Sequence, residues 1–347
     1  MKKYLVILSI IILISFALML SISITYQRPV GDDIWFHLRI SRLYAEGKNA
    51  MFESVGTNSF PYPPLFHLIF VPFILIGLEI PFATLLQVIF YPLAMITVAW
   101  LMWKKVGRIS AIFTILLLLS SFSFFDRTAQ VTPQAFDMIF MPLAVYFFFN
   151  KRTLPFLASF GVMVYSHAPI SFLLFAPFLL YSLMYKENRR MVYISLALMI
   201  PLILISIAFI PTTLTSSQQG IWSIQNPQEA MILENPLQFL LYMGILPSIF
   251  IPLAYYYVSD KRKKTGFDKF VILWLLFLLP MGIFWIDRLA SYIIVPLSIL
   301  IGSYFQLKLE NKPQSVVFMM ILVIFMISIA SHISLWIALI NNMFYVH

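Results

Sequence analysis

Runs of apolar side chains, several of them about as long as a bilayer is thick, constrain this chain more than any other feature. Of its 347 residues, 61% are hydrophobic and 11% are charged, whereas about a quarter of the residues in a soluble domain are charged. A helix needs roughly 20 apolar residues to cross the hydrocarbon core, and the backbone groups of a membrane span must pair within the protein. The sequence therefore predicts an all-α, polytopic membrane protein.

The first apolar run resembles a secretory leader, because Lys2 and Lys3 precede it. It continues from Tyr4 to about Ile24, which is long for a leader, and no cleavage site of small residues follows it. We therefore expect a retained first membrane helix. Eleven spans are expected in all, over residues 4–25, 82–103, 109–125, 134–149, 154–167, 169–185, 191–210, 237–258, 270–286, 289–306 and 315–340.

The stretch from Leu65 to Leu78 is apolar but short, and it contains His67 and Pro72. A stretch of this length is more often interfacial or re-entrant than spanning. If it lies on the outer surface, most of the 23 Lys and Arg residues fall in loops on the side of the N-terminus, as the positive-inside rule requires. We therefore expect a multi-pass protein of the cell membrane whose N-terminus is cytoplasmic. Most of the 14 acidic residues and all five histidines then lie on or toward the outer face, where chemistry is expected.

Composition excludes several classes of function. Cysteine is absent, which excludes disulfides, zinc–thiolate sites and cysteine nucleophiles. The net charge of +9 comes from short basic clusters between apolar runs, which are typical of cytoplasmic loops, so we expect no nucleic-acid partner. No phosphate-binding or dinucleotide-binding glycine motif, zinc-protease motif or serine-hydrolase motif is present. We expect a single integral membrane domain over 1–347, with long outer loops at 26–81 and 211–236 that are candidates for function.

The first outer loop contains the segment Gly31-Asp32-Asp33-Ile34-Trp35-Phe36-His37-Leu38-Arg39. Two adjacent carboxylates at a membrane surface are costly to hold without a partner. They suit a general base for a hydroxyl or a ligand of a divalent metal. The alternative is a helix cap, because an amphipathic helix is expected from about Ile34 to Glu46. His37 follows Asp33 by one helical turn, and Arg39 either binds substrate or contacts lipid headgroups.

Five further residues are candidates for binding a substrate or for a structural role. Arg127 and Arg288 are expected on the outer side, where the positive-inside rule gives no reason for a cation. Their guanidinium groups suit phosphate binding. For Arg127 the alternative is an ion pair with Asp126. His67 and His167 are either site residues or buried structural histidines. Asp137 is expected in the first turn of a helix that begins near Pro133. An acidic residue is favourable there, so this position alone explains Asp137 without a functional role.

These motifs resemble those of the GT-C superfamily of lipid-phosphate-sugar glycosyltransferases. The segment from Gly31 to Arg39 is similar to the first-loop motif of archaeal and bacterial oligosaccharyltransferase catalytic subunits. Tyr62-Pro63-Pro64-Leu65 is similar to the segment before the second span there and in protein mannosyltransferase and aminoarabinose-transferase relatives. The stretch from Asp126 to Asp137 lies where that superfamily carries its second acidic motif, and Arg288 lies where it often carries a phosphate-binding arginine.

The resemblance implies an inverting transferase with a polyprenyl-phosphate-sugar donor and a glycan, lipid or protein acceptor. Asp32, Asp33 and His37 are then the expected catalytic residues. The expected substrate-binding residues are Arg39, Tyr62, His67, Arg127, Gln130, His167 and Arg288. A divalent metal (Mg or Mn) is a possible cofactor, held by Asp32, Asp33, Asp137, Glu229 or Glu234.

The sequence departs from that pattern in two places. Gln130, Thr132 and Gln134 occupy most of the second motif, which puts a two-carboxylate metal site in doubt. No soluble C-terminal domain with an acceptor-recognition motif is found, so we expect a monosaccharide transferase rather than an enzyme that glycosylates asparagine sequons. Two alternatives stay open: a non-catalytic membrane scaffold of the same fold, and a transporter of lipids or solutes.

Overall fold

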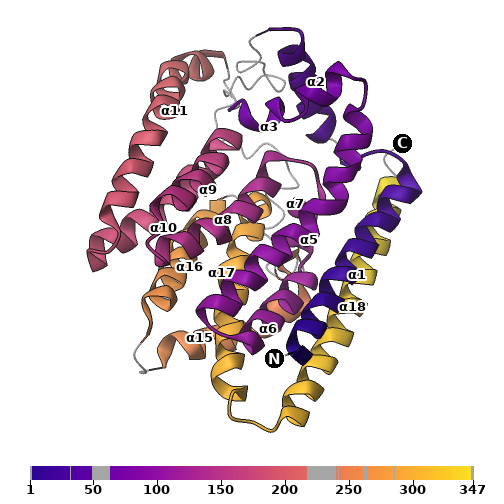
Figure 1. Ribbon diagram of the computed structural model, residues 1–347, viewed down its shortest axis with the longest axis vertical. Helices are drawn as coiled ribbons and strands as arrows, with labels where there is room; N and C mark the ends of the chain where they lie inside the picture. Colours follow the sequence, from indigo (N-terminus) through magenta and orange to yellow (C-terminus); the bar gives the residue numbers. More distant parts are fainter. Residues whose placement is uncertain are drawn as a thin grey trace. The chain divides into compact units, whose positions relative to one another are not determined.

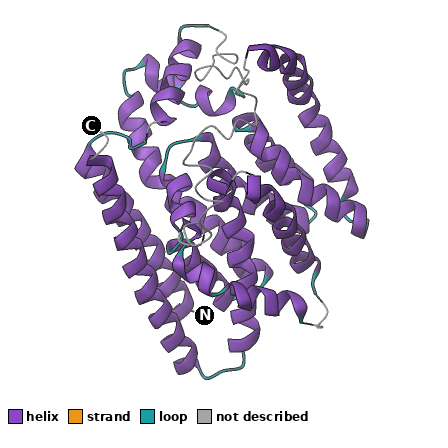
Figure 2. Cartoon of the chain, turned by 180° about the vertical axis from the view of Figure 1, so that it is seen from behind, coloured by secondary structure: helices purple, strands orange, loops and turns teal. Residues whose placement is uncertain are grey.

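The computed structural model describes residues 2–31, 33–48, 63–216, 240, 242–260, 264–284 and 286–344. Within its helices, the side chains of residues 2, 169–170, 205–216, 281–284, 286–288, 332 and 334–344 are not part of the description. Every regular element in the described residues is a helix, and none of these residues forms a strand (Figure 2). The prediction of an all-α chain is confirmed.

Contacts between Cα atoms divide the chain into two compact units. Unit 1 comprises Met1–Ser15, Val98–Arg127 and Gln228–His347, and unit 2 comprises Phe16–Thr97 and Thr128–Pro227. Three helices, α1 (Lys2–Tyr26), α5 (Glu79–Lys105) and α7 (Phe122–Ala129), run through a boundary between the units.

Unit 2 is built around a row of consecutive helices (Figure 1). Its remaining helices are α2 (Asp33–Ala45), α3 (Leu65–Leu68), α4 (Val71–Leu75), α8 (Pro133–Phe149), α9 (Thr153–Ser166), α10 (Ala168–Tyr185) and α11 (Arg189–Ser216). Helix α9 packs against α8, α10 and α11, while α2 packs against α3 and α4. Helix α3 also contacts α9, which joins the segment containing α2, α3 and α4 to the helical row.

Proline sets the start of two helices in this row. Pro133 is the first residue of α8, where a missing N–H costs nothing and the fixed φ suits a helix. His167 separates α9 from α10 in an extended conformation, with φ −150° and ψ 80°, and Pro169 follows in the first turn of α10. The side chain of His167 therefore lies at a fixed corner between two helices.

Unit 1 centres on α6 (Arg108–Leu119), which is buried along its whole length after its first residue. Its other helices are α14 (Ile245–Ile249), α15 (Ile251–Ser259), α16 (Gly266–Phe284), α17 (Ile286–Leu309) and α18 (Gln314–Phe344). Helix α6 packs against α17 and α18, and α17 also packs against α15 and α16 (Figure 1).

Small and hydroxylated residues line the contacts of α6. The Oγ1 of Thr114 donates a hydrogen bond to the Ser298 carbonyl at 3.3 Å, and the Oγ of Ser328 donates to the Leu116 carbonyl at 3.0 Å. Gly302 lies so close to α6 that an added Cβ would stand 2.9 Å from the Ser110 carbonyl oxygen. Close backbone approach with side-chain-to-backbone bonds is typical of helix pairs in membranes.

Four helical segments of the described residues are long and apolar enough to cross a membrane, namely Lys3–Tyr26, Glu79–Lys105, Leu289–Leu309 and Gln314–Ser331. The first and last of them have large exposed apolar side chains, including Leu13 (64% exposed) and Met326 (61% exposed). Such surfaces suit contact with lipid rather than water. The described residues thus form a helical protein with four membrane-spanning candidates, or five if a broken pair of helices counts as one; the eleven-span count stays a prediction.

Two expected helices are interrupted. The span expected over 109–125 is two helices, α6 and α7, bent by 80° at Ser120-Ser121. Gly244, with φ 110°, approaches this bend so closely that an added Cβ would stand 2.6 Å from the Ser120 carbonyl oxygen. The surface helix expected over 65–78 is also two short helices, α3 and α4.

Replacing Gly302 with alanine tests the close contact between α6 and α17. The new Cβ meets the Ser110 carbonyl of the neighbouring helix at 2.9 Å, so we expect a loss of about 1–3 kcal/mol, as for an overpacked core. Gly161 of α9 is the matched control, because nothing lies within 4 Å of a Cβ added there. Gly161→Ala should leave the melting temperature in detergent unchanged or slightly raise it, since alanine favours helix. Equal melting temperatures for the two variants would contradict this account of the contact.

Candidate functional site

The acidic motif of the first loop lies at the start of α2, in unit 2. Gly31 precedes the helix with φ 108°, a conformation that favours glycine, and the Gln130 side chain packs against it, 3.2 Å from the position of an added Cβ. The neighbouring Val30 N–H donates a hydrogen bond to the Gln87 side chain at 3.0 Å. Asp33 is the first residue of α2 and its side chain is exposed. Its carboxylate therefore lies at the N-terminus of a helix, where a negative charge is favourable. This position suits the alternative role that the sequence offers for the aspartates, at the end of a helix.

Two buried histidines join α2 to α3. The Nδ1 of His37 lies 3.0 Å from the Nε2 of His67, and their exposed fractions are 3% and 0%. The ring of Phe66 packs edge-on against His37 and against Phe136 of α8, with centroid distances of 5.3 and 5.4 Å. The pair therefore lies in an aromatic surrounding from which water is largely excluded.

The Nδ1 of His37 and the Nε2 of His67 share one hydrogen, and the tautomers of the two rings decide which nitrogen donates it. The backbone of Pro63 also favours the protonated form of His67. Burial lowers the pKa of His67 from its ordinary 6.5 to about 4, against a smaller opposing effect of the Pro63 bond. Burial, followed by repulsion from His67 and His167, holds the pKa of His37 well below 6.5.

A second buried pair forms between α8 and the corner at His167. The Asp137 carboxylate is completely buried, and its Oδ2 lies 3.2 Å from the Nδ1 of His167. Its other oxygen, Oδ1, accepts a hydrogen bond from the Ser171 hydroxyl at 3.4 Å. His167 is one of the groups that lower the pKa of His37, after burial and His67. Unit 2 thus contains two buried pairs of titratable side chains, from α2, α3, α8 and the corner between α9 and α10.

The arginines of α2 lie on its exposed face. Arg39 is exposed, and its guanidinium carbon lies 6.0 Å from the centre of the Phe36 ring. Arg42 pairs with Glu79 at 3.1 Å. This placement fits both roles that the sequence leaves open for Arg39, contact with lipid headgroups or with a substrate.

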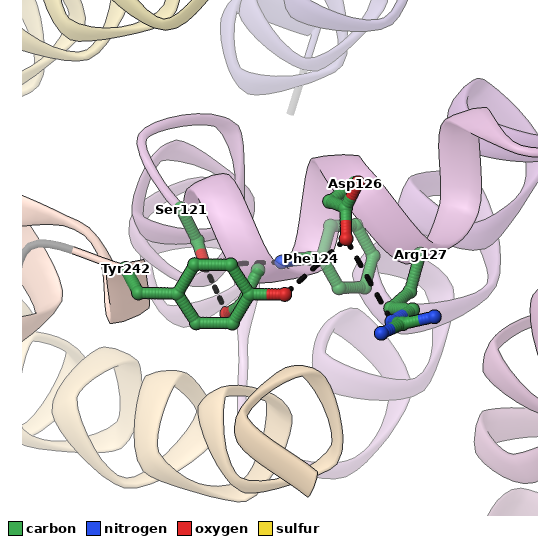
Figure 3. Close-up of polar contacts among 6 residues, drawn as sticks. Ser121, Phe124, Asp126, Arg127 and Tyr242 are labelled. Carbon is green, nitrogen blue, oxygen red and sulfur yellow. Dashed lines mark hydrogen bonds and ion pairs between the residues drawn. The ribbon is translucent and has the colours of Figure 1, made fainter. Parts of the chain in front are cut away.

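Arg127 belongs to unit 1 and lies in the last turn of α7, the helix that follows the bend (Figure 3). The Ser121 hydroxyl accepts a hydrogen bond from the Phe124 N–H at 3.3 Å and thereby caps the first turn of α7. The Asp126 carboxylate accepts a hydrogen bond from the Tyr242 hydroxyl at 3.2 Å and lies 3.7 Å from the Nε of Arg127. The ion pair that the sequence offered as an alternative is therefore present.

Several predicted site residues fall outside the description. Asp32, Tyr62, Glu229 and Glu234 lie outside the described residues. Arg288 is in α17 of unit 1, and its side chain is not described. Among the side chains that are described, no group of three or more His, Asp or Glu is placed to hold a metal ion. The oxygens of Asp137 bond to His167 and Ser171, and the metal site expected from the sequence stays a prediction.

Sequence reasoning singled out His37, His67, Asp137 and His167, but it missed that they form two pairs. The partners in each pair are 30 residues apart and lie on different elements, so no spacing within one helix reveals them. Ser171 was missed altogether. One signal for it existed, because it follows His167 by one turn of α10.

Comparison with known proteins does not assign this chain to a family. No protein-family model matches this chain, and no curated protein matches it. The resemblance to the GT-C superfamily therefore stays an expectation from short motifs.

The buried pair His37–His67 predicts a loss of stability in acid. Because the pKa of His67 is lower in the folded protein than its ordinary 6.5, the unfolded chain binds more protons between pH 6.5 and about 4. The stability linked to this group is fully present above pH 6.5 and is lost as the pH falls toward 4. We expect the melting temperature of the protein in detergent to fall across this range, and less steeply in His67→Gln. The same pH dependence in the variant and the wild type would contradict the account.

Proposed function

We propose that this protein is an inverting membrane glycosyltransferase, which moves a sugar from a polyprenyl-phosphate donor to a lipid, glycan or protein acceptor on the outer face of the cell membrane. The observation that carries the proposal is the presence of two buried pairs of titratable side chains in unit 2, one of which includes His37 of α2. Burying ionisable groups in an apolar protein is costly, and hydrophobic residues pack as well at lower cost. Groups that accept and donate protons are what the transfer of a sugar to a hydroxyl needs.

The motifs supply the remaining parts of the proposal. Asp33 is the first residue of α2. By sequence, Asp32 and Asp33 are the candidates for binding the acceptor and for acting as its base. By sequence alone, Arg127 and Arg288 are the candidates for stabilising the charge that grows on the departing lipid phosphate, the kind of electrostatic stabilisation that dominates such reactions. No step of the proposal requires a metal ion from the described residues, and Asp32, Glu229 and Glu234 stay candidate ligands by sequence alone.

The proposed topology keeps eleven spans, a cytoplasmic N-terminus and an outer active site. The proposal of many spans is supported by the four long apolar helices and by the shorter apolar helices at Pro133–Phe149, Thr153–Ser166 and Ser171–Tyr185. Shorter helices suit the interior of a bundle, where neighbouring helices rather than lipid cover their ends.

Transfer by the purified protein tests the proposed function. Reconstituted with a radiolabelled polyprenyl-phosphate sugar and an extract of membrane lipids and glycans, the wild type should label an acceptor. Asp33→Asn should lower the rate by at least about 100-fold, the range expected when a group that positions the reacting hydroxyl is lost. Glu46→Gln is the matched control, because Glu46 follows the end of the same helix and pairs only across the surface with Lys48 at 2.6 Å; it should keep the wild-type rate.

The scaffold alternative makes the opposite prediction. A non-catalytic relative would label no acceptor in the wild type, whichever polyprenyl-phosphate sugar is supplied. That result would reject the proposed function.

A further inference from the structure

We propose that His167, oriented by Asp137, is the catalytic residue that takes the proton of the acceptor hydroxyl. This inference rests on the proposed function and deepens it, because it moves the base from the aspartate pair at the start of α2 to a buried imidazole. Asp137 acts through His167 and is a positioning residue.

The carboxylate of Asp137 fixes the orientation of the imidazole. A carboxylate only accepts hydrogen bonds, so the Nδ1 of His167 carries the hydrogen that spans the 3.2 Å to Oδ2. The Nε2 on the far side of the ring is then the proton-accepting nitrogen. Ser171 donates to the second oxygen of Asp137 at 3.4 Å and holds the carboxylate in place. This carboxylate–imidazole arrangement is the one by which general bases of many unrelated folds are oriented.

The backbone holds His167 equally firmly. Its N–H donates to the Met163 carbonyl at 2.8 Å as α9 ends, and its own carbonyl accepts from the Ser171 N–H at 3.2 Å as α10 begins. The residue is therefore tied into both helices, and its side chain is only 6% exposed. A base that is locked by packing and by a buried partner needs little reorganisation during reaction.

The aspartate pair is less suited to this task. The described member, Asp33, is exposed in the first turn of α2, where the helix dipole favours its charged form. An imidazole ordinarily has a pKa nearer to neutral pH than a carboxyl group, so it is the better general base there. The two roles are compatible, because Asp33 can bind a hydroxyl without taking its proton.

The proposed step balances as follows. The O–H bond of the acceptor breaks as its proton moves to the Nε2 of His167, and the oxygen forms a bond to the anomeric carbon of the sugar. The bond between that carbon and the phosphate oxygen breaks on the opposite side, and its electron pair leaves with the polyprenyl phosphate. The carboxylate of Asp137 balances the positive charge on the imidazolium, which then returns its proton to water.

Azide tests the assignment, because this anion attacks a sugar without having to lose a proton. His167→Ala should lower transfer to the natural acceptor by at least about 100-fold, yet it should form glycosyl azide at a rate close to that of the wild type when azide is added. Free imidazole should also restore part of the transfer to the natural acceptor. Asp33→Asn should not respond to imidazole, but it should form glycosyl azide at a rate close to that of the wild type, because azide replaces the acceptor that Asp33 is proposed to bind. Size-exclusion profiles and melting temperatures show whether each variant is folded.

Each result decides between the assignments. Rescue of Asp33→Asn by azide, without rescue of a folded His167→Ala, would overturn the proposal in favour of the aspartate pair. Failure of azide to rescue either variant would overturn it as well. Absence of transfer and of glycosyl azide in the wild type would instead reject the proposed function.

The tautomer of His167 tests the proposal without a measurement of transfer, and it can be determined in the wild type even if a variant fails to fold. In protein labelled with ¹⁵N at its five histidines, nuclear magnetic resonance should show His167 protonated at Nδ1 and unprotonated at Nε2 in its neutral form. Asp137→Asn should remove this preference. A neutral His167 that carries its proton on Nε2 would overturn the proposal, whether or not transfer is observed.

Discussion

Buried polar groups of this chain must find their partners inside the protein, and the rest of the structure depends on that constraint. A buried donor or acceptor left unpaired costs several kcal/mol in an apolar surrounding, by general estimates of about 2–7 kcal/mol. In unit 1 the rule appears as hydroxyls bonded to carbonyls of neighbouring helices, at Thr114 and Ser328. In unit 2 it appears as pairs of titratable side chains, His37 with His67 and Asp137 with His167. The first arrangement fixes helix packing, whereas the second pairs titratable side chains that come from different elements of unit 2.

The sequence predicts most of the helical structure because hydropathy is a strong signal in an apolar chain. It also predicts the helix at the acidic motif, expected from about Ile34 to Glu46 and found at Asp33–Ala45. The bend in the span expected over 109–125 escapes prediction, since Ser120 and Ser121 barely interrupt the apolar run. This bend depends on the close approach of Gly244, which is more than a hundred residues away in the chain and can be recognised only in three dimensions.

The candidate site was predictable by residue but not by arrangement. An isolated histidine or aspartate in an apolar chain stands out, which is why His37, His67, Asp137 and His167 were all singled out. Their partners could not be foreseen, because helical periodicity relates residues one turn apart and says nothing of which helices are neighbours. The contacts change what is expected of Asp137: its carboxylate bonds to an imidazole and a hydroxyl, whereas the sequence alone offered an acid at a helix start or a metal ligand.

The account makes one central claim, that the buried groups of unit 2 serve the transfer of a sugar at the outer face of the membrane. The most direct test in the cell is mass spectrometry of the glycans and glycolipids from a strain that lacks this gene, compared with the same strain carrying the wild-type gene. The account predicts one class of glycan or glycolipid that is shorter by a single sugar in the deletion strain and complete after complementation. Identical glycans and glycolipids in the two strains would contradict it.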